Sequence, residues 1–325
     1  MPSFNYLIEK ILNAPVIEHP FPHIYIENFF DHDDFQQIIS TESIHTEPFN
    51  NDQEMFDSLF EMGYKIIDFP GCITSTKEYI NWHKQKEPST KTNTSCESFG
   101  LTLRLINPQS ELLLALKSFI ESEKFITTLA SRFNIYLDQV EPDNGIQKYL
   151  DGYEISPHPD VRKKALTYMV NINPHNNSEE LFHHTQYLKF KRQYEYITQF
   201  WNGNPDVERC WVPWDWCDSI FTQSKNNSFL MFSPSSSTMH AVKANYNHLK
   251  GQRTQLYGNL WYKNVNTLDK LEWESLVIGN NQTKEFLSQS ASTFASKISS
   301  GLKKLFFPDD LSNYEKITRQ PDDYK

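Results

Sequence analysis

The 325-residue chain has only four cysteines, and this shortage narrows the classes of protein that it can be. Cys72, Cys96, Cys210 and Cys217 form no CxxC pair. Their spacing argues against a disulfide-rich secreted scaffold and indicates reduced thiols in a cytoplasmic protein. A metal site at Cys210 and Cys217 is the alternative, although six intervening residues are unlike the short ligand spacings of zinc sites.

Long apolar runs and basic patches are also missing. No run approaches the roughly 18–20 apolar residues of a membrane span, and the start, MPSFNYLIEKILNAPV, lacks the features of a secretory signal. The net charge of −10 arises in residues 1–60, where eleven acidic side chains face a single lysine, Lys10. We therefore expect no membrane span and no nucleic-acid partner. The acidic segment is interpreted as a solvated surface, with a cationic substrate as the alternative.

What the chain does contain is a series of short strand patterns between residues 138 and 263. They fit an α+β protein with a double-stranded β-helix core, a cupin-like jelly roll, better than a doubly wound sheet. A doubly wound sheet would need helices between 219 and 263, and none is indicated there. The predicted strands are Gly145–Leu150, Tyr153–Ser156, Ala165–Asn171, Cys210–Pro213, Ser219–Thr222, Ser228–Phe232, Met239–Lys243 and Thr254–Tyr262.

Residues 1–137 are predicted to flank this core within the same catalytic domain. The segment HIYIENFF predicts a strand, and Asp31–Asp34 offer caps for a following helix. Apolar spacing predicts two helices within Ser110–Asn134, separated near Ser122–Lys124. Further elements expected here are a helix over Thr76–His83, a polar loop over Lys84–Ser98 and a strand over Leu101–Ile106.

Residues 174–218 are interpreted as an insertion in the core. A helix is predicted over Glu179–Tyr196. The tryptophans that follow are expected to pack the insertion onto the barrel, with an aromatic wall for the substrate as the alternative. These tryptophans are Trp201, Trp211, Trp214 and Trp216.

Residues 264–307 are predicted to form a C-terminal helical extension, based on Phe286, Phe294, Ile298, Leu302 and Leu305 at helical spacing. We expect this helix to pack on the domain, with a membrane-surface or dimer helix as the alternative. The polar tail 308–325 is predicted to be disordered.

The most informative pattern is His158-Pro159-Asp160, followed eighty residues later by His240. Two imidazoles and a carboxylate are the ligand set that holds Fe(II) on one face and leaves other positions open. In an extended segment the side chains of 158 and 160 point to the same side, so both could reach one ion. The distance along the chain to His240 means that only the fold can bring the third ligand close.

Arg253 lies thirteen residues after His240, at the start of a predicted strand. Its guanidinium could clamp a carboxylate through two parallel hydrogen bonds. One face of this strand would carry Arg253, Gln255, Tyr257, Asn259 and Trp261. So many polar groups on one side of a central strand indicate a lined cavity. A solvent-exposed face is the alternative.

With His158, Asp160, His240 and Arg253, and with the entry segment PFPHIYIENFF, the chain resembles the iron(II)- and 2-oxoglutarate-dependent dioxygenases, in particular the prolyl-hydroxylase-like branch. The resemblance is clearest over residues 20–40 and 138–263. The insertion 174–218 and the absence of an early glycine pair within it depart from the pattern, and these departures leave the substrate open.

The resemblance implies a cofactor set and roles for named residues. His158, Asp160 and His240 would be the catalytic metal ligands for Fe(II), and O2 and 2-oxoglutarate would be co-substrates. Arg253 would hold the distal carboxylate of 2-oxoglutarate. Two further residues are assigned to the cofactor pocket: Tyr149, for which an ordinary core tyrosine is the alternative, and Gln255.

The implied reaction is hydroxylation of an unactivated C–H bond in a small molecule, an amino acid or a peptidyl residue, with release of succinate and CO2. Asp160 favours hydroxylation over halogenation, because the related halogenases have a small residue at this place. A catalytically inactive jelly-roll binding module is the alternative. Substrate identity and oligomeric state stay open.

A zinc hydrolase is a third hypothesis. His175, His183 and His184 lie near Glu179 and Glu180, but no HExxH motif is present. Histidines in a polar helix are expected to be solvated.

Overall fold

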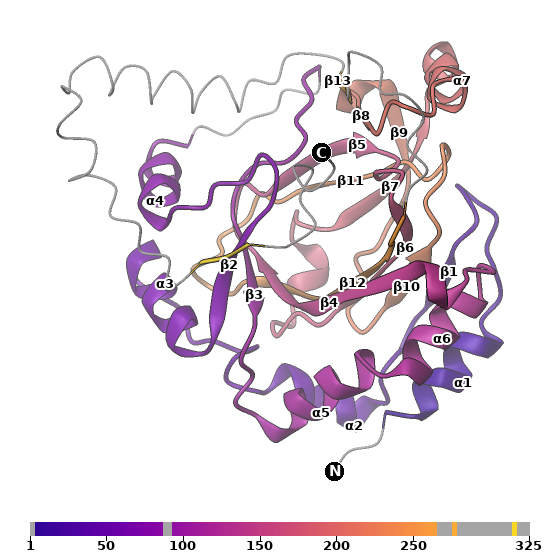
Figure 1. The fold of residues 1–325 in the computed structure, drawn as a ribbon. Helices are drawn as coiled ribbons and strands as arrows, with labels where there is room; N and C mark the ends of the chain where they lie inside the picture. The colour runs from indigo at the N-terminus through magenta and orange to yellow at the C-terminus, as the bar shows by residue number, and fades with distance from the viewer. Residues whose placement is uncertain (1–3, 87–92, 265–274, 278–313, 317–325) are drawn as a thin grey trace.

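Two sheets face one another in the computed structural model, which describes residues 4–86, 93–264, 275–277 and 314–316. Helices α1, α2, α5 and α6 cover the outer face of the larger sheet, and α3 and α4 lie beside its β2–β3 edge (Figure 1). The helices are α1 Tyr6–Asn13, α2 His32–Ile39, α3 Asp52–Glu61, α4 Thr76–Lys84, α5 Glu111–Ile120, α6 Glu123–Ser131 and α7 Tyr196–Gly203.

The larger sheet has the order β1-β10-β6-β12-β4-β3-β2-β14. Its strands are β1 Ile24–Ile26, β2 Tyr64–Asp68, β3 Thr102–Leu105, β4 Val140–Tyr149, β6 Lys164–Asn171, β10 Phe229–Phe232, β12 Arg253–Tyr262 and β14 Tyr314–Lys316. The side chains of the central strand β12 alternate between its two faces. Leu256 and Leu260 pack into the core shared with the helices, whereas the odd-numbered residues face the other sheet. Gly258 is required, because a Cβ there would lie 2.3 Å from the Tyr168 ring.

The smaller sheet has the order β5-β11-β7-β9. Its strands are β5 Glu154–His158, β7 Thr185–Phe190, β9 Cys217–Thr222 and β11 His240–Lys243. A further short strand, β8 Arg209–Trp211, pairs in parallel with β13 Ser275–Val277. All eight strands predicted between 138 and 263 are therefore present, with shifted ends.

The helix predicted over Glu179–Tyr196 is wrong, because β7 occupies the middle of that segment. β7 pairs with both β11 and β9, so the segment 174–218 contributes a strand to the smaller sheet. Strand pairing buries Tyr187 and Phe190 and leaves Lys189 exposed. The surrounding charged residues conceal this short alternation in the sequence.

The N-terminal helices pack on the outer face of the larger sheet through aromatic contacts. Phe29 stacks on Phe229 of β10 with ring centroids 4.6 Å apart, and Phe125 of α6 meets Tyr168 of β6 edge-on. The predicted break between α5 and α6 is confirmed, because the Ser122 side chain accepts from the Phe125 N–H and caps α6. The predicted helix at α4 and the strands at β1 and β3 are also confirmed.

The Trp-rich segment forms a second, smaller core. Trp201 is buried there with Leu188 and Met239, and Trp214 and Trp216 pack against the same cluster. The prediction that these three tryptophans pack the segment onto the sheet is confirmed. Trp211 behaves differently, because its ring lines the cavity between the sheets.

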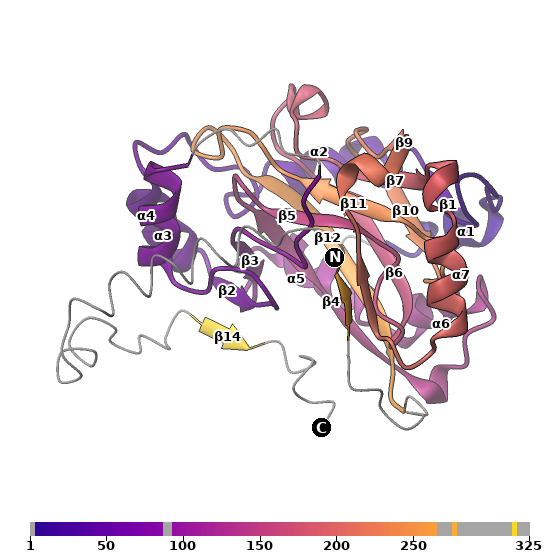
Figure 2. The same ribbon diagram turned by 90° about the horizontal axis from the view of Figure 1, so that it is seen from above.

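The predicted C-terminal helix, from Phe286 to Leu305, lies outside the described residues. Within the tail 308–325, residues Tyr314–Lys316 form β14, which runs parallel to β2 (Figure 2), so the prediction of disorder is wrong for these residues. No helix in the described part of the chain is long and apolar enough to cross a membrane. All four cysteines are unpaired, as predicted.

A buried ionic network fastens α3 and α4 to the loops beside the smaller sheet. His83 of α4 lies between two carboxylates, with 3.0 Å from Nδ1 to Asp52 and 3.1 Å from Nε2 to Asp151. Asp52 also accepts from His248 at 2.9 Å, and Asp151 accepts from Lys86 at 2.6 Å. Asp52, His83 and His248 together could hold a metal ion. Because each of their hydrogen-bonding atoms is already satisfied within the network, we interpret the network as structural.

His83 is therefore expected to stabilise the fold as a cation. Burial lowers its pKa, but hydrogen bonds and charge from Asp151 and Asp52 outweigh burial and raise the pKa to about 9. A raised pKa in the folded state gives stability that is complete below the unfolded pKa of about 6.5 and is lost as pH rises through about 9.

We predict that His83→Gln lowers the free energy of unfolding by about 1.5–3 kcal/mol at pH 6, since it removes hydrogen bonds to charged groups. The difference from the unmodified chain should shrink between pH 7 and pH 10, as measured by urea denaturation. His32→Gln, on the exposed side of α2, is the control and should change little. A difference that grows with pH would contradict the assigned charge.

Candidate metal centre

Strands β5 and β11 bring two of the predicted ligands together. In their antiparallel register, His158 at the end of β5 lies directly opposite His240 at the start of β11. The ring centroids are 4.2 Å apart, and both residues are buried. Two residues that are 82 positions apart in the sequence thus become neighbours through strand pairing alone.

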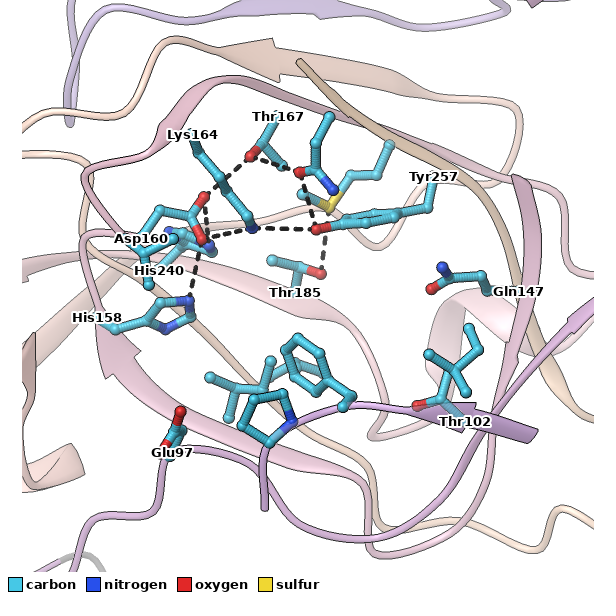
Figure 3. A pocket seen from close by; sticks show the side chains of 18 of the residues that line it. Glu97, Thr102, Gln147, His158, Asp160, Lys164, Thr167, Thr185, His240 and Tyr257 are labelled. Atoms are coloured by element: carbon cyan, nitrogen blue, oxygen red, sulfur yellow. Dashed lines mark hydrogen bonds and ion pairs between the residues drawn. The ribbon is translucent and has the colours of Figure 1, made fainter. Parts of the chain in front are cut away.

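The two imidazoles are oriented in the same way. Nδ1 of His158 lies 2.9 Å from the Ser156 carbonyl oxygen, and Nδ1 of His240 lies 2.8 Å from the Thr238 carbonyl oxygen. Each carbonyl accepts from the ring two residues later, which fixes the proton on Nδ1 and leaves the Nε2 lone pair free. Both Nε2 atoms point toward Asp160 (Figure 3).

Asp160 reaches the histidines through a turn and not along a strand. The sequence-based expectation of an extended His158–Asp160 segment is wrong, because β5 ends at His158 and Asp160 has a φ of 74°. Aspartate tolerates this left-handed region better than most residues. The turn is tied to the other histidine, because Thr238 donates to the Pro159 carbonyl at 2.8 Å.

The three side chains fit a metal ion. The Asp160 carboxylate oxygens lie 3.6 Å from His158 Nε2 and 3.8 Å from His240 Nε2. Ligands with bonds of about 2.1 Å at right angles lie about 3 Å apart, so a small closure would suffice. Burial, followed by the charge of His158, lowers the pKa of His240 to about 3, which keeps this imidazole neutral and able to donate a lone pair.

Two residues that were not predicted hold Asp160. Lys164 donates to one carboxylate oxygen at 2.7 Å, and Thr167 donates to the other at 2.9 Å (Figure 3). Burial acts to raise the pKa of Asp160, but the charge of Lys164 and the histidines holds it well below its usual value. Burial acts to lower the pKa of Lys164, but the charge of Asp160 outweighs this effect and raises it, so this side chain is an ammonium. A lysine four residues after Asp160, at the start of the buried strand β6, is the signal that could have indicated it.

A cavity of about 160 Å³ lies between the sheets and includes the triad in its wall. The predicted face of β12 lines this cavity with Arg253, Gln255, Tyr257, Asn259 and Trp261. The alternative of a solvent-exposed face is therefore wrong.

Arg253 is 1% exposed and forms no ion pair with any carboxylate of the described residues. Its guanidinium donates to the Thr185 hydroxyl at 3.0 Å and lies 4.6 Å from the centre of the Tyr149 ring. Its Nε–H has no partner. Burial lowers its pKa, and neighbouring tyrosines, Tyr149 and Tyr153 foremost, oppose that effect.

The other two predicted cofactor contacts also line the cavity. The Tyr149 hydroxyl hydrogen-bonds with the Gln147 amide at 2.6 Å, and Gln255 donates to Asn171 at 2.8 Å. Both side chains therefore have protein partners.

The histidines of the zinc-hydrolase hypothesis do not form a metal site. His183 and His184 are buried outside any helix, so the expectation of solvated helical histidines is wrong. Both contact the Ser178 carbonyl through Nε2. Glu179 is instead held by Lys225 and the Asn226 N–H. Among the described residues, no group of potential metal ligands includes these histidines.

No protein-family model matches the chain, and no curated protein matches it. Several solved structures give weak likenesses, and three of them are as follows. A prolyl-4-hydroxylase of Pseudomonas putida shares 7% identity with a TM-score of 0.38, covering 81% of this chain and 100% of that one. A prolyl hydroxylase of Trichoplax adhaerens, in complex with a hypoxia inducible factor peptide fragment, shares 12% with a TM-score of 0.37, covering 80% and 89%.

The third is an oxidoreductase of the 2OG-Fe(II) oxygenase family from Burkholderia pseudomallei. It shares 10% identity with a TM-score of 0.28, covering 69% of this chain and 96% of that one. The identities and TM-scores are low, so the function proposed for this chain depends on its own site geometry.

We predict that Asp160→Asn weakens binding of Co(II) by at least about 100-fold, because one of three ligands is lost. Visible absorption of the bound ion and calorimetry would measure this. Asp52→Asn, in the ionic network of α3, is the matched control and should leave the cobalt site intact. Loss of cobalt binding in Asp52→Asn with retention in Asp160→Asn would place the ion elsewhere.

Proposed function

We propose that this protein is an iron(II)- and 2-oxoglutarate-dependent oxygenase that hydroxylates an unactivated C–H bond of a small molecule, amino acid or peptidyl residue. The observation that carries the proposal is that one cavity includes both the His158, Asp160 and His240 triad and the buried Arg253. Two imidazoles and one carboxylate suit Fe(II) and leave adjacent positions open.

We further propose that the two facing sheets form a jelly roll. Strands β10-β6-β12-β4 lie side by side in the larger sheet, opposite β5-β11-β7-β9 in the smaller one. Along the chain, β4, β5, β6 and β7 alternate between the two sheets, and so do β9, β10, β11 and β12. Such winding across two four-stranded sheets supports a double-stranded β-helix.

Arg253 supports a dicarboxylate co-substrate. A buried cation without an anionic partner is costly, and natural sites keep one when a ligand supplies the opposite charge. The planar guanidinium matches a carboxylate through two hydrogen bonds, and its unpartnered Nε–H is available for one of them. Tyr149 and Thr185 hold the guanidinium in place. The distal carboxylate of 2-oxoglutarate is thus the proposed partner of Arg253.

The remaining residues orient and shield the centre. When bound, iron(II) with 2-oxoglutarate and O2 supplies the oxidising chemistry and yields succinate and CO2. His158 and His240 present their Nε2 atoms, and Asp160 supplies the negative charge. The Asp160 carboxylate also fills the place that a halide would need, which favours hydroxylation. Met169, Trp211 and other cavity walls limit the access of water.

A catalytically inactive binding module is the second candidate. It predicts ligand binding without consumption of 2-oxoglutarate. The complete set of donors, each with an ordered outer partner, favours the enzyme.

We predict Fe(II)-dependent succinate release from 2-oxoglutarate, slow without substrate and faster with the correct one. His240→Ala and Asp160→Ala should abolish it, because each removes a metal ligand. Succinate can be measured by mass spectrometry, with His32→Gln as a control that retains activity. Binding of 2-oxoglutarate with no turnover under any substrate panel would favour the binding module.

We predict opposite effects of Arg253→Met on stability and on co-substrate affinity. Removing a buried unpaired cation should raise the melting temperature of the ligand-free protein, because desolvation of the charge is avoided. The dissociation constant for 2-oxoglutarate should rise by about 10- to 100-fold, since charge-assisted hydrogen bonds are lost. Thermal unfolding with and without 2-oxoglutarate measures both quantities.

Arg192→Met, at an exposed position, is the control for this prediction. An unchanged affinity for 2-oxoglutarate in Arg253→Met would mean that another residue holds the carboxylate.

A further inference from the structure

The cavity holds hydrogen-bond donors that the described part of the chain does not satisfy. The indole N–H groups of Trp211 and Trp261 have no partner, although these residues are only 5% and 9% exposed and both line the cavity. The Thr102 hydroxyl has no partner either, but it lies at the Arg253 end of the cavity, since Thr102 pairs with Tyr149 and Tyr149 pairs with Arg253. Buried polar groups are nearly always paired, so the two indole donors indicate a ligand with acceptor oxygens.

Strand register separates Trp261 from the position proposed for 2-oxoglutarate. Along the β6–β12 pair, Gln255 lies opposite Asn171, Asn259 opposite Thr167, and Trp261 opposite Lys164. Arg253 stands at the first residue of β12, and Trp261 lies near the other end. Thr167, which contacts Asp160, lies between them.

Lys164 lies beside Trp261. Its ammonium lies 5.5 Å from the Trp261 ring centre, and it donates to the Tyr257 hydroxyl at 3.2 Å as well as to Asp160. An ammonium has three N–H donors, so one is left beyond these two partners. Its side chain is 11% exposed.

The charge balance of the cavity, with a metal ion and 2-oxoglutarate bound, also indicates an anionic ligand near Lys164. Arg104 is paired with Asp143 at 2.7 Å, and Arg209 is paired with Glu97 at 2.6 Å. Arg253 would be neutralised by the co-substrate. Once Asp160 shares its charge with a divalent ion, Lys164 loses most of its counter-charge, and a nearby anion would restore the balance.

We propose that Lys164, together with the Trp261 N–H, binds an anionic group of the substrate, a carboxylate or a phosphate. The substrate is then a molecule or residue whose negative charge lies close to the C–H bond that is hydroxylated. This inference depends on the proposed oxygenase function, because it assumes a metal ion on Asp160 and 2-oxoglutarate on Arg253.

The test uses the full chain loaded with Co(II) and 2-oxoglutarate, and paired probes that differ in one anionic group. The pairs are L-aspartate with L-asparagine, L-glutamate with L-glutamine, and O-phospho-L-serine with L-serine. The readouts are the melting temperature and the cobalt absorption spectrum, neither of which needs turnover. The first two pairs test a carboxylate and the third tests a phosphate.

At least one anionic probe is expected to raise the melting temperature and alter the cobalt spectrum more than its neutral partner. Lys164→Met should weaken that binding by about 10- to 100-fold, because a charge-assisted hydrogen bond is lost. Bound cobalt should keep this variant folded, since the ion replaces the lost charge beside Asp160. Trp261→Phe, which removes the N–H donor and replaces the indole with a smaller aromatic ring, should weaken binding less.

Lys189→Met, an exposed lysine of β7 outside the cavity, is the control and should bind as the unmodified chain does. Equal binding of all paired probes, or an anion preference that survives in Lys164→Met, would overturn the inference while leaving the oxygenase function intact. Absence of cobalt bands before any probe is added would overturn both.

Discussion

The antiparallel register of β5 and β11 is the constraint on which the site depends. It sets His158 opposite His240, and no local sequence feature could bring these residues together. Side chains alternate between the two faces of a strand, so a slip of one residue would turn one imidazole away from the other. The bond from Thr238 to the Pro159 carbonyl ties the turn that carries Asp160 to the segment before His240. Strand pairing and this turn therefore assemble the three donors before any ion is present.

The charged side chains of the cavity favour ligand binding, at a cost to the stability of the ligand-free protein. Asp160 and Lys164 stabilise one another in the metal-free protein, and Thr167 completes the carboxylate's hydrogen bonds. Arg253 has no such counterpart among the described residues, and burying an unpaired cation costs free energy. The chain thus keeps a cation at a position that only an anionic ligand would neutralise. By contrast, the ionic network around His83 is internally balanced, which fits a role in fastening α3 and α4.

The sequence predicted much of this arrangement, and the failures have physical reasons. The polar groups at alternate positions along Arg253–Tyr262 correctly indicated a lined cavity, because the two-residue repeat of a strand is easily recognised over ten residues. The same logic failed for β7, where a short alternation is surrounded by charged residues that suggest a helix. It also failed for Asp160, since left-handed backbone at a non-glycine residue leaves no mark in the sequence. Lys164 and Thr167 were missed because their roles depend on that turn.

The most direct test of the central claim is a crystal structure of the chain grown without oxygen in the presence of Fe(II) and 2-oxoglutarate, with the iron located by its anomalous scattering. The account predicts iron bound by His158 Nε2, His240 Nε2 and an Asp160 oxygen, with the distal carboxylate of 2-oxoglutarate on Arg253. Iron bound elsewhere, or 2-oxoglutarate bound away from Arg253, would contradict it.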